Sequence, residues 1–261
     1  MRPPVALSVA GSDSGGGAGI VADAATFRAH GVWPAVAVTA VTAQDTVGVH
    51  AVEVVRPDVV AAQVEAVCHD LRPAAVKTGM LGTAAVVEAV AAALAAAGAG
   101  SAMPLVVDPV LCSTSGAALL EPKAVALLVE RLLPLAALVT PNLAEAAALT
   151  GLAVDDRAGM AAAATAILAM GPSAVLVTGG HLPGAVVADC LVTGAGARWF
   201  TGRRIEAAGS HGTGCVLSAA VTARLARGET LEDAVAGARR FVRRAIRDGV
   251  SLGAGPGAVR P

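Results

Sequence analysis

The strongest chemical signal in this sequence of 261 residues is the segment HGTGC at residues 211–215, which leads into an apolar run. That run, residues 215–227, is predicted to be a helix. The first N–H groups of a helix have no partner within it, and its dipole places about half a positive charge there. Because glycine leaves these groups uncovered, Gly212, Thr213 and Gly214 predict a site for phosphate, or for charge that develops during its transfer.

Cys215 stands at the predicted start of this helix. A thiol in that position can have a pKa well below its usual value of about 8.5. A lone buried cysteine is more often only a small apolar side chain. Beside the anion site, two roles stay open for Cys215: it accepts a proton from a hydroxyl group, or it shapes the site.

Two carboxylates, Asp108 and Glu145, follow two different predicted strands. Mg²⁺ prefers oxygen ligands and keeps several waters, so one or two carboxylates suffice to hold it. The alternatives are a turn at Asp108-Pro109 and a helix-terminal charge at Glu145. Asn142 could simply cap the helix that follows it. We favour a magnesium site with both carboxylates, bound directly or through water.

Other polar residues suit a small flat ligand. Gln44 offers donors and an acceptor that match the edge of an aminopyrimidine or a pyridine, and Met80 could contact a flat ring. Asp23 is a carboxylate among apolar neighbours in the predicted helix 18–29, with a surface charge as its alternative. Lys77 could be a salt-bridge partner or a phosphate counter-charge. The glycine-rich loop from Gly11 fits neither the dinucleotide fingerprint nor a P-loop, and predicts close approach of backbone to a ligand.

The elements that must position these residues alternate between short β-type runs and longer helical runs. Predicted strands include residues 5–10, 35–42, 74–78, 105–108, 136–140 and 174–178, and predicted helices include 18–29, 143–150 and 157–170. This order favours a single-domain, three-layer α/β/α fold over residues 1–261, with a mostly parallel sheet between helices. Ligands of such sheets bind beyond the carboxyl ends of the strands, where the polar residues gather.

Composition narrows the function classes. With 19 basic and 20 acidic residues the net charge is −1, and aromatic residues make up 2%. Neither feature suits nucleic-acid binding. The long uncharged stretches, 89–107 and 158–188, are interrupted by glycine and proline, so no membrane span is expected. The four cysteines include no Cys-x-x-Cys pair, which favours a reducing cytoplasm.

Six motifs occur in a specific order and spacing: AGSDSGGGAG (10–19), TAQ (42–44), VKTGMLG (76–82), VDPV (107–110), TPNL (140–143) and HGTGC. Together they resemble the hydroxymethylpyrimidine/phosphomethylpyrimidine kinases of thiamin biosynthesis, in the ribokinase-like superfamily. The resemblance runs from about residue 5 to about residue 252. It implies phosphorylation, dependent on ATP and Mg²⁺, of the pyrimidine's hydroxymethyl group and then of the monophosphate. It also implies a homodimer.

The resemblance assigns a role to each matching position. The pyrimidine pocket is matched by Gly11, Asp23, Gln44 and Met80; the anion hole by Gly212, Thr213 and Gly214; the catalytic position by Cys215; the nucleotide site by Asn142, Thr178 and Thr213; and the metal site by Asp108 and Glu145.

The sequence departs from the family in three places. Thr178 stands where lysine is frequent, Ala208-Gly209-Ser210 replaces a polar segment, and the tail at 252–256 lacks the usual histidine. These changes bear on rate and nucleotide affinity more than on reaction type. A pyridoxal kinase is the nearest alternative, followed by a non-catalytic vitamin- or nucleotide-binding protein. A sugar kinase is disfavoured, because Cys215 replaces its expected aspartate.

Overall fold

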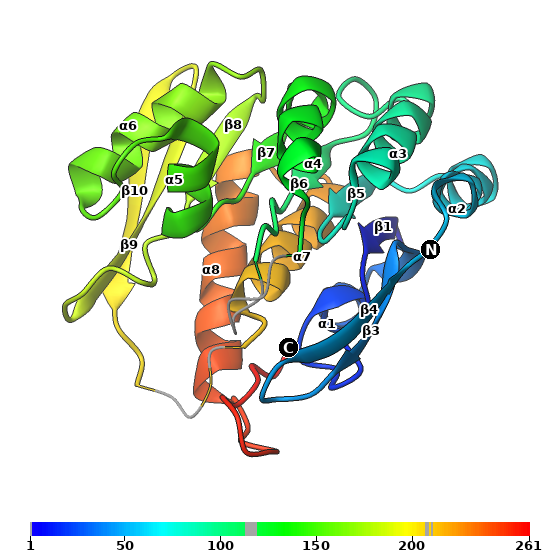
Figure 1. The fold of residues 1–261 in the computed structure, drawn as a ribbon. Coiled ribbons are helices and arrows are strands. Elements are labelled where there is room, and N and C mark those ends of the chain that lie inside the picture. Colours follow the sequence, from blue (N-terminus) through cyan, green and yellow to red (C-terminus); the bar gives the residue numbers. More distant parts are fainter. Residues whose placement is uncertain (1, 113–118, 207–208, 210) are drawn as a thin grey trace.

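The computed structural model describes residues 2–112, 119–206, 209 and 211–261. Within these residues the main sheet has eight strands in the order β10-β9-β8-β7-β6-β5-β1-β2 (Figure 1). The sheet is parallel from β2 to β8, whereas β9 runs antiparallel to both β8 and β10. Its strands are β1 (Val5–Ala10), β2 (Trp33–Val38), β5 (Ala75–Thr78), β6 (Leu105–Val107), β7 (Leu138–Val139), β8 (Ala174–Val177), β9 (Val186–Thr193) and β10 (Gly196–Arg203).

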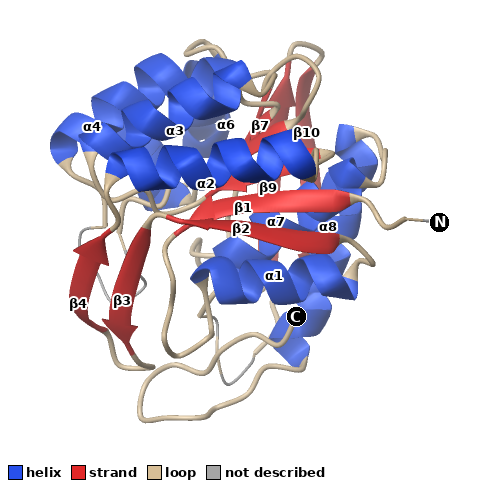
Figure 2. Cartoon of the chain, turned by 90° about the vertical axis from the view of Figure 1, so that its right-hand side faces the viewer, coloured by secondary structure: helices blue, strands red, loops and turns tan. Residues whose placement is uncertain are grey.

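Helices cover both faces of the sheet, which confirms the predicted mostly parallel α/β fold (Figures 1 and 2). Among the described helices, none is both long and apolar enough to cross a bilayer. One layer holds α2 (Pro57–Asp70), α3 (Ala84–Ala96), α4 (Pro122–Leu127), α5 (Leu143–Thr150) and α6 (Arg157–Leu168), and the other holds α1 (Gly19–Ala29), α7 (Thr213–Ala226) and α8 (Leu231–Arg247).

The central strands are apolar on both sides because both sides are covered. Successive side chains of a strand point to opposite faces. Val107 and Val139 belong to the core under the α2–α6 layer, while Val106 and Leu138 belong to the core under α7 and α8. This alternation decides which face each polar residue at a strand end points toward.

One predicted element was wrong. Residues 35–42 were expected to form a single strand, but β2 ends at Val38, and β3 (Ala40–Gln44) pairs with β4 (Val49–Val54) in a separate antiparallel ribbon. Figure 2 shows this ribbon standing away from the main sheet. The break has a simple cause: β1, the neighbour of β2, ends at Ala10, and Thr39 donates to the carbonyl oxygen of Met80 at 2.6 Å. Beyond Thr39 the chain therefore pairs with β4 instead.

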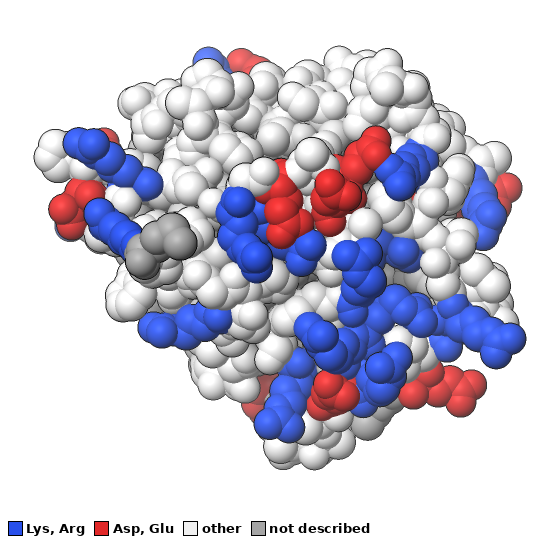
Figure 3. All heavy atoms as spheres, turned by 180° about the vertical axis from the view of Figure 1, so that it is seen from behind, with Lys and Arg blue, Asp and Glu red and all other residues white. Residues whose placement is uncertain are grey.

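Charge is unevenly distributed although the total is near zero. Helix α8 buries one row of side chains, among them Val235, Ala238 and Val242, against the sheet. Its outer row carries the exposed side chains of Arg240, Arg244 and Arg247. Basic side chains accordingly gather on the face seen from behind (Figure 3).

Candidate active site

The carboxyl ends of the central strands meet the N-terminus of α7 at one edge of the sheet (Figure 1). Apart from residues on α1 and β3 and at the start of α7, the predicted site residues lie just after strands of the main sheet or at the start of the helix that follows such a strand. The glycine-rich loop from Gly11 follows β1, Met80 follows β5, Asp108 follows β6, Asn142 and Glu145 follow β7, and Thr178 follows β8.

Helix α7 begins at Thr213, two residues earlier than predicted, with Gly212 at its N-cap. Gly212 has a φ of 84°, in the left-handed region that favours glycine. A Cβ on Gly212 would lie 1.9 Å from the carbonyl oxygen of Gly17, so no larger residue fits. A Cβ on Gly214 would meet no atom within 4 Å. No described side chain caps the helix, so its first amides receive no side-chain hydrogen bond from the described residues.

Cys215 lies in the first turn of α7 and is partly buried. Burial raises the pKa of its thiol to about 12, and the nearby carboxylates of Asp108 and Asp23 act in the same direction. The ammonium group of Lys77 opposes them without reversing the shift. The prediction of a lowered thiol pKa is therefore wrong, because desolvation outweighs the helix dipole. The thiol stays protonated at neutral pH.

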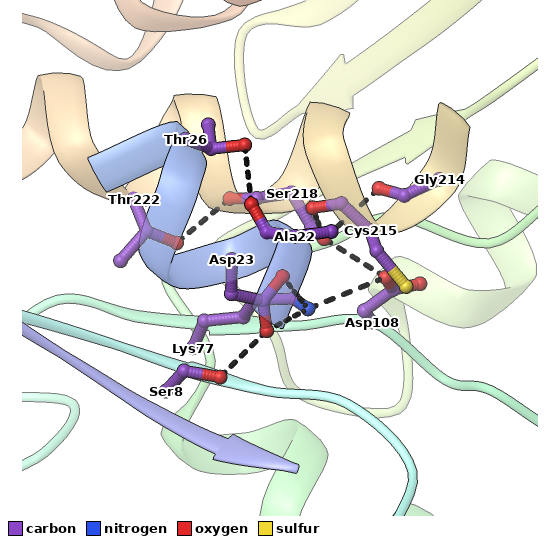
Figure 4. Close-up of polar contacts among 10 residues, drawn as sticks. All are labelled: Ser8, Ala22, Asp23, Thr26, Lys77, Asp108, Gly214, Cys215, Ser218 and Thr222. Atoms are coloured by element: carbon purple, nitrogen blue, oxygen red, sulfur yellow. Dashed lines mark hydrogen bonds and ion pairs between the residues drawn. The ribbon is translucent and has the colours of Figure 1, made fainter. Parts of the chain in front are cut away.

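Beneath the first turns of α7 lies a buried network of ionic groups (Figure 4). Lys77 on β5 donates to both carboxylate oxygens of Asp23, at 2.7 and 2.8 Å, and its Nζ lies 4.0 Å from Oδ2 of Asp108. Ser8 donates to Asp23 at 2.6 Å, and Ser218 on α7 donates to Asp108 at 2.8 Å. Although burial acts to lower the pKa of Lys77, these charges raise it above its usual value.

The network corrects two expectations. Asp23 is 0% exposed and both its oxygens are bound to Lys77, so it presents no carboxylate to a ligand, nor is it a surface charge. Of the two roles considered for Lys77, the structure shows the salt bridge. Asp23 acts on the site through its charge, which helps to raise the pKa of Cys215, and through Lys77, whose Nζ lies 4.0 Å from Asp108.

Lys77→Met is predicted to destabilise the protein by about 3–5 kcal/mol, because it leaves the buried charge of Asp23 without a partner. Urea unfolding of the ligand-free protein measures this loss. The double variant Lys77→Met/Asp23→Leu removes both charges and should recover part of it. A single-variant loss below about 1 kcal/mol would show that the pair contributes little to folding.

Asn142 and Glu145 form a reciprocal cap on α5. Asn142 Oδ1 accepts from the Glu145 amide and Glu145 Oε2 accepts from the Asn142 amide, both at 2.9 Å. The capping role considered for Asn142 is confirmed. Burial, followed by repulsion from Asp108, raises the pKa of Glu145 to about 8, against the lowering effect of N–H groups of Asn142 and Leu111.

The donor chemistry at Asp108 and Glu145 fits Mg²⁺. Both carboxylates are buried, they repel each other, and the pKa of each is raised. A cation between them would relieve this repulsion, and hard oxygen ligands are what Mg²⁺ prefers. Within the described residues no group of three His, Cys, Asp or Glu side chains could hold a metal ion. Phosphate oxygens and water would have to complete the coordination.

Stability of the ligand-free protein should fall as pH rises from about 4.5 to about 8, because folded Glu145 holds its proton more tightly than the unfolded chain does. The contribution of Glu145 to the free energy of unfolding is fully present below its pKa in the unfolded chain, about 4.5. It is lost as the pH rises to its pKa in the folded protein, about 8. Calorimetric melting between pH 5 and pH 8.5, without metal or nucleotide, measures it. Glu145→Gln should flatten this part of the profile; an unchanged slope in that variant would rule the assignment out.

Gly11 and Met80 are in contact: a Cβ on Gly11 would lie 3.0 Å from Sδ of Met80. Gln44 is half-buried on β3, and its backbone N–H donates to Oγ of Ser14 in the glycine-rich loop at 3.2 Å. The structure thus brings Gly11 and Met80 together and links Gln44 to the loop that begins at Gly11, whereas Asp23 belongs to the buried ionic network.

The glycine-rich loop is also tied to the anion site, a link that the sequence analysis missed. Nε2 of His211 lies 3.0 Å from Oδ2 of Asp13. Burial acts to raise the pKa of Asp13, but hydrogen bonds from His211 and the Gly15 amide outweigh it and lower that pKa. No spacing rule links residues 198 positions apart. The contact between Ser218 and Asp108 was easier to anticipate from the sequence. Ser218 lies one helical turn after Gly214, so it is on the same face of the helix as the predicted anion site.

Thr178 lies beside Asn142, another residue that the resemblance assigns to the nucleotide site. Its amide donates to the carbonyl oxygen of Pro141 at 3.0 Å, and it forms a β-bridge with Asn142. Of the second departure from the family, Ala208 and Ser210 lie outside the described residues.

Comparison with known proteins agrees with this geometry. The phosphomethylpyrimidine kinase family model matches residues 13–260. The chain is 50% identical over 258 residues to the hydroxymethylpyrimidine/phosphomethylpyrimidine kinase of Rhizobium meliloti (strain 1021), covering 98% of this chain and 96% of that protein.

Two solved structures share the fold. A phosphomethylpyrimidine kinase from Clostridium difficile 630 superposes with a TM-score of 0.82 at 38% identity, covering 93% of this chain and 99% of that one. Pyridoxal kinase of Bacillus subtilis, solved as an ADP complex, superposes with a TM-score of 0.91 at 34% identity, covering 99% and 97%. The chain therefore belongs to the phosphomethylpyrimidine kinase family, a group of phosphotransferases with the ribokinase-like fold.

Proposed function

We propose that residues 1–261 act as one kinase domain that transfers the γ-phosphoryl group of ATP to 4-amino-5-hydroxymethyl-2-methylpyrimidine, and then phosphorylates the monophosphate to the diphosphate, in thiamin biosynthesis. The observation that carries the proposal is the first turn of α7, which no described side chain caps and whose next turn contacts the buried carboxylate of Asp108 through Ser218. The ADP complex of the B. subtilis relative supports a nucleotide as donor.

The acceptor side positions the pyrimidine. Gln44 offers a donor and an acceptor to the amino group and the adjacent ring nitrogen. Gly11 and Met80 form an apolar contact for the ring, and the glycine lets backbone approach closely. These contacts would turn the hydroxymethyl oxygen toward the phosphate in line with the bond to be broken.

The donor side stabilises charge. The N–H groups from Gly212 to Cys215 would take up negative charge on the migrating phosphoryl group, and removal of one such donor typically costs about 3–4 kcal/mol. Asn142 and Thr178 would contact the nucleotide beside them. Asp108 and Glu145 would hold Mg²⁺. When bound, Mg²⁺ neutralises charge on the ATP phosphates.

Cys215 shapes the site in this proposal and is not the base, since its thiol pKa is raised to about 12. Cys215→Ala should therefore reduce phosphorylation of the alcohol and of the monophosphate by similar factors, within about threefold of each other. Separate turnover assays with the two substrates measure this ratio. A loss confined to the alcohol step would instead identify Cys215 as the proton acceptor.

A coupled ATPase assay with the pyrimidine alcohol, its monophosphate, pyridoxal and ribose tests the proposal. We expect turnover with both pyrimidines. The second candidate is a pyridoxal kinase, favoured by the TM-score of 0.91 to the B. subtilis enzyme, and turnover with pyridoxal alone would support it. Ligand-induced thermal stabilisation without any turnover would favour a binding protein.

We also propose a homodimer in the cytoplasm that requires neither nucleic acid nor membrane. The β3–β4 ribbon carries exposed apolar side chains, Val41, Val47 and Val52, which association would cover. Light scattering after gel filtration distinguishes a dimer from a monomer.

A further inference from the structure

Two buried hydroxyl groups in the described part of the chain have no hydrogen-bond partner. They belong to Thr78, which is 0% exposed, and to Thr140, which is 5% exposed. A buried hydroxyl left unpaired costs stability, so such groups are rare and each requires a physical explanation. The two threonines stand at the ends of strands β5 and β7, on either side of β6.

Thr140 faces the candidate active site. It follows Val139, which packs under the α2–α6 layer, so strand alternation turns Thr140 toward α7. The Thr140 amide donates to the carbonyl oxygen of Val107 at 3.0 Å, which places Thr140 beside Asp108 in the register of the sheet. Asp108 also points to this face, because it accepts from Ser218 on α7. Neighbouring strands lie about 4.8 Å apart, so Thr140 lies next to Asp108 on the face of the sheet that α7 covers.

Thr78 faces the other way. It is in register with Val107 on β6 and two residues after Val76, and both valines pack under the α2–α6 layer. Thr78 is therefore turned away from α7. The chain thus offers a matched pair: two threonines, both buried and both unpaired, on opposite faces of the sheet at the ends of the two strands that flank β6.

We propose that Thr140 is a further nucleotide-binding residue, whose hydroxyl donates a hydrogen bond to a terminal phosphate oxygen of bound ATP. This inference rests on the proposed function. A hydroxyl can donate to a phosphate oxygen without adding a charge beside Asp108. The hydroxyl is unpaired in the absence of nucleotide because its partner is supplied by the ligand.

The test compares Thr140→Val and Thr140→Ser with the control Thr78→Val. Thr140→Val keeps the shape and removes the hydroxyl. We expect kcat/KM for ATP to fall about 10- to 100-fold, the range produced by losing one hydrogen bond to a charged group. The melting temperature of the ligand-free protein should not fall, because no internal hydrogen bond is lost. Thr140→Ser should retain most activity, and Thr78→Val should stay within about twofold of the unmodified protein.

Calorimetric binding gives a readout that does not depend on turnover. With Mg²⁺ present, Thr140→Val should weaken binding of the β,γ-methylene analogue of ATP about tenfold or more and leave ADP binding unchanged. Equal weakening of both nucleotides, or full restoration by excess Mg²⁺, would overturn the assignment to the terminal phosphate. Unchanged binding and activity, or a lowered melting temperature, would show that the hydroxyl has no role with the nucleotide. If the unmodified protein lacks kinase activity, the proposed function fails, and the binding comparison still decides the role of Thr140.

Discussion

Gly214→Ala should stabilise the protein and remove most of its activity. Alanine is favoured over glycine in a helix by up to about 1 kcal/mol, which corresponds to a rise of at most about 2–4 °C in melting temperature for a chain of this size. The new Cβ would meet no atom within 4 Å, so the fold can accept it.

The same methyl group should block the anion site. The Cα–Cβ bond in a helix leans toward the N-terminus, which places the Gly214 methyl where a phosphate must approach the amides. We expect kcat to fall about 10²- to 10³-fold, the scale of losing one donor of this kind.

A matched control is available in Gly194, in the turn between β9 and β10, where a Cβ also meets open space. Gly194→Ala should leave turnover unchanged. Steady-state kinetics and thermal melting on the two variants separate blocking of the site from general effects of the substitution. Full activity in Gly214→Ala together with a raised melting temperature would refute an anion site at this turn.

Asp108→Asn should lower kcat/KM about 10³-fold and raise the Mg²⁺ concentration needed for half-maximal rate. The variant removes a carboxylate that would hold the metal, whose charge stabilisation is worth several kcal/mol, and each 1.36 kcal/mol is tenfold in rate. Asparagine can still accept the Ser218 hydroxyl, so the fold should persist.

Asp58→Asn is the control, because Asp58 is an exposed carboxylate paired only with Arg56 among the described contacts. Its turnover should match that of the unmodified protein. Rates measured across a Mg²⁺ titration distinguish a metal effect from loss of folded protein. An Asp108→Asn variant with normal Mg²⁺ dependence and normal rate would exclude Asp108 from the metal site.

The sequence allowed accurate prediction of elements whose signals are local. Helix α5 was predicted with its observed bounds, residues 143–150, and β1 with its own, residues 5–10. Their apolar runs are bounded by Pro4 and Gly11 for β1 and by Asn142 and Gly151 for α5. The break at Thr39 was missed because it depends on where the neighbouring strand β1 ends, which is at Ala10. The residue types at 35–42 carry no information about the length of that neighbour.

Contacts and burial at the site were harder to predict. Asp23 and Lys77 are 54 residues apart, and only the packing of α1 against the sheet brings them together. For Cys215, the sequence indicated that the residue lies at the start of a helix but not how deeply its thiol is buried. That burial decides the direction in which the thiol pKa shifts. The start of α7 was predicted to within two residues, because the glycines before it and its apolar run are both local features.

A crystal structure with Mg²⁺, the β,γ-methylene analogue of ATP and the pyrimidine alcohol tests the central claim most directly. We predict a terminal phosphate oxygen within about 3.1 Å of at least two amide nitrogens from Gly212 to Cys215, with the hydroxymethyl oxygen on the opposite side of the phosphorus. A terminal phosphate bound away from these amides, or amides turned toward protein atoms instead, would contradict the account.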